Sequence, residues 1–374
     1  MDVIIIGAAM PFGPETLKHR SLGGSETAQL MAGRTLAKQG HNVTQVTALP
    51  APGEPDHIAS GAIGPDGVRY LEPDDWRSIL ANTPCDLLVI SREPRFAESG
   101  HRAKFAVFWT HDVAEPGFLP RVLGIVGHNI DEIWPVSHWH AQQIHAVTGY
   151  PLARMFATRN GIVDIRDEAV VGAAAPMPAR AEHTLLYATQ PERGALALLR
   201  RGGIMERLPE FTLELCAYDY RRPELAGLYQ EVEARAAALA NVRLLGPLRQ
   251  PGVRAAIARA SAYVYPGYIM ETSCILAREC IEQGTPFLTT KVGAVPETLG
   301  DCGIYFGEAL AWNSDAFCAA FAAMVRAVIS PEGDALRARV ASSMAARRDL
   351  YWDDVVSAWI DRARAHIARS GAPP

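Results

Sequence analysis

The sequence predicts an α/β fold of two domains, each built around a parallel β-sheet. Short apolar segments of strand length alternate with amphipathic segments of helical length, as is typical of parallel sheets with crossover helices. This alternation restarts after residues 169–181, which are rich in Ala, Pro and Gly and therefore indicate a linker. The length of 374 residues agrees with two or three domains.

Composition and charge restrict the class of protein. With 49% hydrophobic and 21% charged residues, the chain is typical of soluble globular proteins. The net charge of −5 argues against a general electrostatic grip on nucleic acid. No apolar run approaches the roughly 20 residues of a membrane span, and the start does not read as a signal peptide. We expect a cytoplasmic protein, with peripheral membrane or acceptor contacts through Arg200-Arg201 or Arg221-Arg222 as one interpretation and solvated surface as the other.

The six cysteines point to the same compartment. They show no Cys-x-x-Cys pairing, and several stand in apolar segments. We therefore expect buried, reduced thiols.

The first half predicts a series of strands and helices in βαβ order. An unbroken apolar run at 3–6 indicates a fully buried strand. Further strands are expected at 42–47, 86–91, 104–110, 132–136 and 153–157, and helices at 24–39 and 137–148. The second half predicts strands at 183–189, 211–217, 242–246, 261–266 and 286–290, and helices that include 224–240, 252–260 and 351–368.

Two features of the first half suggest ligand contacts. Gly23 and Gly24 open the first long helix, and a Cβ at either position would hold a ligand away from the backbone; a helix start without a ligand is the alternative. His111 follows the strand 104–110, at the carboxyl end where doubly wound folds bind ligands; a structural histidine is the alternative. His138, His140 and His145 do not share a helical face, so we expect them on a helix surface and not around a metal.

The most informative stretch lies between a buried strand and a helix that ends at Gly284. Thr272 and Ser273 are candidate N-caps of that helix, whose backbone N–H groups and dipole suit a phosphate. Glu271 and Glu279 flank its start, eight positions apart, which is about 2.2 helical turns and too far for a direct pair. Hydroxyl groups flanking a phosphate would suit both carboxylates; two surface carboxylates on an amphipathic helix are the alternative.

Two glutamates separated by seven residues in this setting resemble the retaining glycosyltransferases of family 4. The resemblance runs from Gly23-Gly24-Ser25-Glu26 through Asn160-Gly161 to the Trp-containing tail. It implies the GT-B architecture, in which two Rossmann-like domains with parallel sheets face each other across a cleft. Residues 1–165 would form the acceptor-side domain, 166–182 the linker and 183–350 the nucleotide-sugar-binding domain. Residues 351–374 would pack back on the first domain as a helix.

The resemblance also implies roles for particular residues. Glu271 and His111 would contact the donor sugar, and Glu279 the ribose. Arg193-Gly194 stands where the family has Lys-Gly, so Arg193 would neutralise the diphosphate, while Ala188-Thr189 replaces the family's Gly-Arg. Arg249 is a candidate substitute for the missing cation. The remaining donor-binding residues implied are Gly23, Gly24, Thr272, Ser273, Cys274, Ile275, Gly246 and Leu248.

The expected reaction is transfer of a sugar from a nucleotide diphosphate sugar, with a UDP-sugar as the expected donor, and with retention at the anomeric carbon. No Asp-x-Asp motif occurs, so we expect no metal and no other cofactor, with a front-face mechanism implied by the resemblance. The acceptor is left open among a lipid-linked glycan, a polysaccharide, a small molecule and a modified nucleic-acid base. A sugar-nucleotide epimerase or phosphorylase, or a catalytically silent sugar-nucleotide-binding protein, are the alternatives.

Overall fold

The computed structural model describes residues 1–114, 129–164, 178–217 and 221–370. Most of the predicted linker, residues 165–177, therefore lies outside the described residues. The chain forms two compact units, Met1–Val163 with Tyr351–Pro374, and Asp164–Leu350. Each unit is built on a six-stranded sheet whose strand pairs are all parallel. The predicted α/β fold class with two Rossmann-like units is confirmed.

The first unit has the strand order β3-β2-β1-β4-β5-β6. Its central strands are unbroken apolar runs because helices cover both faces of the sheet and leave no side for water. The strands are β1 (Asp2–Ile6), β2 (Asn42–Val46), β3 (Arg69–Leu71), β4 (Cys85–Ser91), β5 (Ala103–Thr110) and β6 (Glu132–Pro135). The helices are α1 (Thr16–His19), α2 (Gly24–Lys38), α3 (Trp76–Asn82), α5 (His138–Thr148) and α14 (Trp352–Ser370).

Two features of the first sheet differ from the expectations. The edge strand β3 is not among the expected strands; its central residue is buried and its two flanking residues are at least partly exposed, so it lacks the continuous apolar run that indicates a buried strand. The strand expected at 153–157 is wrong. Residues Leu152–Arg154 form a 3-10 turn after Pro151, and Met155 alone makes a bridge, to Ile133.

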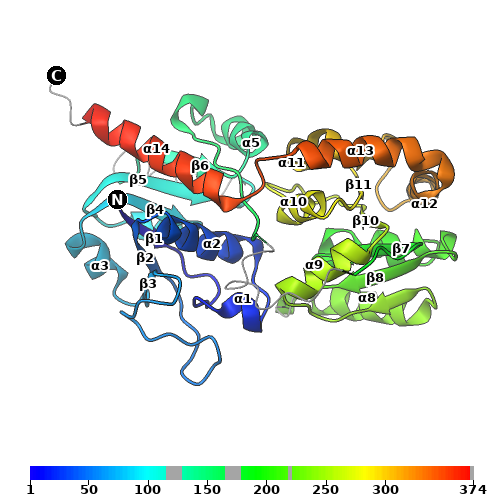
Figure 1. Cartoon of the computed structure of the whole chain (residues 1–374), viewed down its shortest axis with the longest axis horizontal. Coiled ribbons are helices and arrows are strands. Elements are labelled where there is room, and N and C mark those ends of the chain that lie inside the picture. Colours follow the sequence, from blue (N-terminus) through cyan, green and yellow to red (C-terminus); the bar gives the residue numbers. More distant parts are fainter. Residues whose placement is uncertain (115–128, 165–177, 218–220, 371–374) are drawn as a thin grey trace. The chain divides into compact units, whose positions relative to one another are not determined.

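The C-terminal helix α14 belongs to the first unit, where it lies beside α2 (Figure 1). Its apolar stripe faces the sheet: Trp359 is fully buried, with its ring centroid 4.8 Å from that of Trp109 and 5.3 Å from that of Trp134. Gln39 of α2 donates a hydrogen bond to the carbonyl of Asp353 at 3.1 Å. The stripe therefore serves packing.

The start of α14 packs closely against the backbone at Gly161. A Cβ at this position would lie 2.6 Å from the backbone nitrogen of Trp352, and a backbone atom cannot yield as a flexible side chain can. We expect Gly161→Ala to lower the free energy of unfolding by about 2 kcal/mol, the usual cost of overpacking. Urea titration measures this. Gly227→Ala is the matched control, because nothing lies within 4 Å of the position that a Cβ would take there; equal stability of both variants would contradict the prediction.

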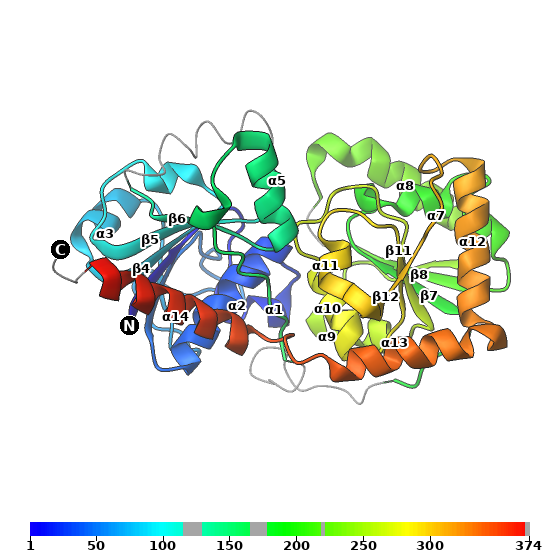
Figure 2. The same cartoon turned by 90° about the horizontal axis from the view of Figure 1, so that it is seen from above.

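The second unit has the strand order β12-β11-β10-β7-β8-β9. Helix α8 covers one face of the sheet, and α9 and α10 cover the other (Figure 2). The strands are β7 (Thr184–Ala188), β8 (Thr212–Cys216), β9 (Val242–Leu244), β10 (Ala262–Tyr265), β11 (Phe287–Thr289) and β12 (Gly303–Tyr305). The helices are α7 (Ala195–Leu199), α8 (Ala226–Ala238), α9 (Gln250–Arg259), α10 (Ile275–Glu282), α11 (Val295–Leu299), α12 (Asp315–Ile329) and α13 (Asp334–Ala346).

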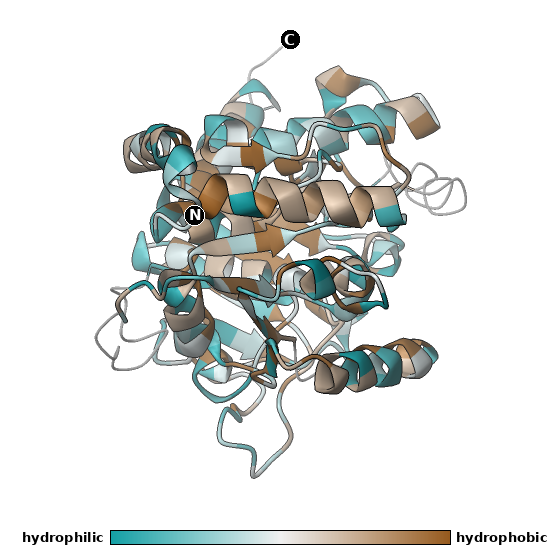
Figure 3. Ribbon diagram, turned by 90° about the vertical axis from the view of Figure 1, so that its right-hand side faces the viewer, coloured by the Kyte–Doolittle hydropathy of each residue, from teal (hydrophilic) through white to brown (hydrophobic). Residues whose placement is uncertain are grey.

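Hydropathy follows this layering. The strands at the centre of the sheet are apolar, and the surrounding helices alternate between apolar and polar positions (Figure 3). All six cysteines are free thiols. Within the described ranges, no single helix has the length and apolarity to cross a membrane. Helices α12 and α13 pass that test only as a pair, which is bent by 77°.

Candidate functional site

The strand orders place one topological switch point in each unit, where consecutive connections run to opposite sides. In the second unit this point lies between β7 and β10, and in the first between β1 and β4. Ligands of open α/β sheets bind beyond the carboxyl ends of the strands at such points. The segments that follow β7 and β10 carry Arg193 and Glu271.

Arg193 and Glu271 form an ion pair in the second unit, through Nη1 and Oε1. The backbone of Gly194 permits this approach: its φ is +143°, and a Cβ there would lie 2.8 Å from the carbonyl oxygen of Pro266. The turn after β7 therefore packs directly on the loop after β10. This close packing and the positive φ explain why a glycine stands at position 194, directly after Arg193.

Three further contacts hold Glu271 in place. The Tyr265 hydroxyl donates to Oε1 of Glu271 at 2.5 Å, and burial raises the pKa of Tyr265 well above its usual value, so the phenol remains a donor. Ala294 N–H donates to the Glu271 carbonyl at 2.7 Å. Gly293 has a φ of +55°, and its Cβ would lie 2.3 Å from that carbonyl oxygen. The Glu271 side chain remains 12% exposed, so a ligand can reach it.

Helix α10 begins at Ile275, with Cys274 as its N-cap residue and no side-chain hydrogen bond capping it. The expectation that Thr272 or Ser273 caps this helix is wrong, because both stand before the N-cap position in the loop. All four predicted phosphate-contacting residues from Thr272 to Ile275 are half-buried. Burial raises the pKa of the Cys274 thiol to about 12, so this cysteine is not a thiolate nucleophile at neutral pH.

Glu279 lies inside the second unit, about one turn into α10, and is only 5% exposed. Its Oε1 accepts a hydrogen bond from Nε2 of Gln250 and lies 4.0 Å from Nε of Arg254. The pKa of Glu279 is raised overall, because burial outweighs the opposing charge of Arg254 and the Gln250 hydrogen bond. Glu279, the predicted ribose contact, is therefore more buried than a carboxylate on the surface of an amphipathic helix would be. Sequence reasoning did not identify Gln250 or Arg254.

In the first unit, His111 follows β5 and packs against Trp109, with ring centroids 4.4 Å apart. Burial, and then the positive charge of Arg92, lower the pKa of His111 to about 3. The imidazole is therefore neutral at pH 7. A neutral ring can contact hydroxyl groups, but it brings no charge to a diphosphate.

Arg92 connects the two ligand-contact candidates of the first unit. Its guanidinium donates two hydrogen bonds to Asp112, both 2.9 Å long, and one to Ser25 Oγ at 2.9 Å. It also pairs with Glu26 at 3.3 Å. Arg92 thus joins the start of α2 to the segment that carries His111. Sequence reasoning missed Arg92, although the rule that selected His111 applies to it equally, since Arg92 directly follows β4.

The predicted glycines of the first unit stand at the start of α2. Gly23 is its N-cap residue and Gly24 is exposed. A Cβ on Gly23 would lie 2.3 Å from Oε2 of Glu26. A small pocket next to the start of α2 is lined by Gly7, Ala8, Ala9, Phe12, Ser25, Glu26, Gln29, Ser91, Arg92 and Glu93.

The expectation that His138, His140 and His145 lie on a helix surface is wrong for His140. This residue is fully buried, and its Nε2 donates a hydrogen bond to the Asp112 carbonyl at 2.8 Å. Ser137 caps the helix by accepting from His140 N–H at 3.0 Å. Among the residues that the structure describes, no three His, Cys, Asp or Glu side chains form a group that could hold a metal.

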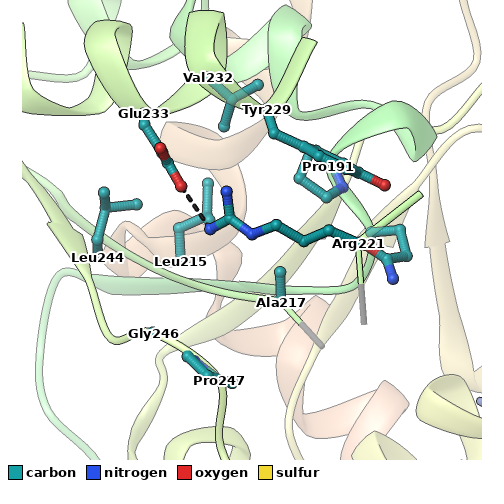
Figure 4. Close-up of a pocket in the computed structure, with 11 residues that line it drawn as sticks. Pro191, Leu215, Ala217, Arg221, Tyr229, Val232, Glu233, Leu244, Gly246 and Pro247 are labelled. Carbon is teal, nitrogen blue, oxygen red and sulfur yellow. Dashed lines mark hydrogen bonds and ion pairs between the residues drawn. The ribbon is translucent and has the colours of Figure 1, made fainter. Parts of the chain in front are cut away.

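A larger pocket lies on the α8 side of the second sheet (Figure 4). Arg221 extends through it to an ion pair with Glu233 (Figure 4). Gly246 lines this pocket, and the other predicted donor-binding residues do not. Leu248 is half-buried and Arg249 exposed in the segment that leads into α9, with Arg249 as the N-cap residue.

No family model matches the sequence, and no curated protein matches it either. Solved structures do resemble it along nearly the whole chain. AviGT4, a glycosyltransferase involved in avilamycin A biosynthesis, has 17% identity and a TM-score of 0.58, with 99% of this chain and 98% of that chain covered. HepE from Anabaena, in complex with UDP and glucose, has 12% identity and a TM-score of 0.63, covering 98% and 100%. The catalytic domain of starch synthase IV from Arabidopsis thaliana, bound to ADP and acarbose, has 13% identity and a TM-score of 0.64, covering 98% and 99%.

At these identities the likeness establishes the fold. The chain has the two-domain, Rossmann-like GT-B fold. Fold alone does not determine chemistry, so the function rests on the residues described above.

Proposed function

We propose that this protein is a glycosyltransferase that moves a sugar from a nucleotide diphosphate sugar to an acceptor. One observation carries the proposal: the ion pair of Arg193 with Glu271 and the start of α10 lie in the segments that follow the carboxyl ends of β7 and β10. This is a cation, a hydroxyl-binding carboxylate and a helix N-terminus at the switch point of one sheet. The neighbours in complex with UDP and ADP support the same class of donor.

The residues would divide the donor between them. The diphosphate would bind the backbone N–H groups at the start of α10, with Arg193 neutralising the charge that grows as the glycosidic bond breaks. Glu271 would accept hydrogen bonds from the sugar hydroxyls, and Glu279 from the ribose. In the first unit, His111 is the candidate sugar contact that the resemblance implies, in its neutral form.

The proposal also includes the identity of the donor, the stereochemistry and the mechanism. They are a UDP-sugar as donor, retention at the anomeric carbon, and a front-face mechanism in which the leaving phosphate assists deprotonation of the acceptor. Among the donor-contacting residues named above, Glu271 is already held by Tyr265 and Arg193. That engagement favours a binding role for Glu271 over a nucleophilic one.

Slow hydrolysis of the donor without acceptor tests the proposal. The protein is incubated with radiolabelled UDP-, ADP- and GDP-sugars, and the free sugar and its anomeric configuration are followed. Release of sugar that Glu271→Gln abolishes supports the transferase, and release of the α-anomer from an α-linked donor supports retention. Accumulation of an epimeric nucleotide sugar would identify an epimerase instead, and binding without turnover a silent binding protein.

We expect turnover to be independent of divalent metal. No Asp-x-Asp motif occurs in the sequence, and Arg193 with the α10 N-terminus supplies positive potential where the diphosphate would bind. The donor-hydrolysis rate should be the same in EDTA as in manganese or magnesium. Loss of activity in EDTA that manganese restores would contradict this expectation.

A further inference from the structure

Helices α9 and α10 share a buried group of charged side chains. Arg254 of α9 is 1% exposed and Glu279 of α10 is 5% exposed. Arg254 Nη1 pairs with Oε2 of Glu282, one turn beyond Glu279 on the same helix. An arginine this deeply buried is rare unless it is paired, so its position on α9 is tied to the carboxylates of α10.

The contacts of Glu279 are distributed unequally between its two oxygens. Gln250 and Arg254, one turn apart on α9, both approach Oε1. Oε2 accepts no hydrogen bond from the described part of the chain. The carboxylate is therefore held at one oxygen by the protein, while the other oxygen keeps its lone pairs.

The pKa of the Glu279 carboxylate depends on side chains of α9. Burial disfavours the ionised form of Glu279, and Arg254 is the first opposing influence, followed by Gln250. The other groups near the carboxylate do not replace them. Cys274 and Cys280 are thiols whose pKa values are raised by burial, and Arg278 pairs instead with Asp349. Without Arg254, Glu279 would face burial with a single amide donor.

We propose that Arg254, assisted by Gln250, is a positioning residue that holds Glu279 in the orientation that receives the vicinal hydroxyls of a nucleoside diphosphate. An ionised carboxylate accepts from two hydroxyl groups, whereas a protonated one spends its own proton as a donor. The inference rests on the proposed function for the identity of the ligand. It adds the group on which the ribose contact depends.

A purely structural role for Arg254 makes a different prediction. If Arg254 only ties α9 to α10 through Glu282, its loss would weaken every ligand of this unit alike. If Arg254 acts through Glu279, its loss weakens only ligands that present ribose hydroxyls. A nucleotide that lacks both hydroxyls separates the two cases.

The experiment is calorimetric titration of the full chain with UDP, ADP and GDP, followed by the 2′,3′-dideoxy form of the nucleotide that binds most tightly. We expect the wild type to prefer the ribonucleotide by about tenfold or more. Arg254→Met should remove most of that preference while changing the affinity for the dideoxy form less than about twofold. Arg278→Met is the matched control, since it removes a second buried arginine that does not approach Glu279; it should keep the wild-type preference.

The remaining outcomes are distinguishable. An Arg254→Met variant that keeps the preference, or loses affinity for both forms alike, overturns the inference and leaves the proposed function standing. A wild type that binds none of the three nucleotides overturns the proposed function. A wild type that binds both forms equally overturns the ribose role of Glu279, and the inference with it. If Arg254→Met does not fold, Gln250→Leu takes its place, with a smaller loss of the same selectivity expected.

Discussion

Replacing Arg193 with alanine is expected to lower the catalytic rate at saturating donor by at least about 100-fold, the scale seen when one stabilising group is removed from a transition state. Under the proposed function, Arg193 is the cation placed at the diphosphate, so it would carry most of the side-chain charge neutralisation. Because charge grows on the diphosphate as the glycosidic bond breaks, a cation there stabilises the transition state more than the ground state.

The ion pair with Glu271 adds a second reason for a large effect. Without Arg193, the carboxylate keeps the Tyr265 hydroxyl and loses the guanidinium that orients it. Arg193→Lys should recover only part of the rate, because an ammonium keeps the charge but not the planar pair of donors. Steady-state rates measure both variants.

Arg326→Ala serves as the control for that experiment. Arg326 forms an ion pair with Glu210 that is exposed on both sides, and exposed pairs contribute little to stability. Its rate should equal that of the wild type. A near wild-type rate for Arg193→Ala would mean that another cation, such as Arg249, neutralises the diphosphate.

The second prediction separates the two glutamates. Glu279→Ala should weaken the binding of free nucleoside diphosphate by about 10- to 150-fold, equivalent to the 1.5–3 kcal/mol of a charge-assisted hydrogen bond. Glu271→Ala should leave that affinity nearly unchanged and lower turnover by a similar factor. The reason is that Glu271 would meet only the sugar, which the free nucleotide lacks.

Calorimetry with the nucleoside diphosphate and rate measurements with the complete donor test this division. Glu271→Ala also removes the carboxylate partner of Arg193 and leaves the guanidinium charge for the phosphates. The affinity for the nucleotide should therefore not fall in this variant. Equal losses of nucleotide affinity in both variants would contradict the assignment. Glu282→Ala is a useful comparison, since it removes the other carboxylate that pairs with Arg254 and leaves Glu279 in place.

The architecture could be predicted because it depends on local pattern. The run at Val3–Ile6 and the apolar segment before Glu271 have the length and composition of buried strands, and the helices after them end at glycines with positive φ, Gly40 and Gly284. Each of these signals is contained in a short stretch of consecutive residues. The sequence analysis predicts neither β3 nor β12, which are edge strands with partly exposed patterns.

The contacts within the candidate site could not be predicted in the same way. Arg193 and Glu271 are 78 positions apart, and no local pattern indicates that they pair. Arg254 occupies the same face of α9 as Ile257, so a helical pattern would assign an apolar residue there. The burial of Arg254 is explained by its ion pairs with Glu279 and Glu282 on α10. The spacing of residues in the sequence suggests candidate ligand-binding residues. It does not identify the side chains that hold those residues in place.

The two glycine contacts around the loop after β10 have a consequence for how this protein could acquire new donors. Gly194 and Gly293 press backbone against backbone on either side of this loop, and the Trp312 indole donates to the Pro266 carbonyl at 2.8 Å. A loop braced in this way is preorganised, so a donor meets it without the entropic cost of ordering it. A side chain at either glycine would meet the backbone of the loop, at 2.8 Å from the Pro266 carbonyl oxygen and 2.3 Å from that of Glu271. Donor preference would therefore change by side-chain replacement at exposed positions such as Tyr268 and Met270, 47% and 52% exposed, and not by remodelling the loop.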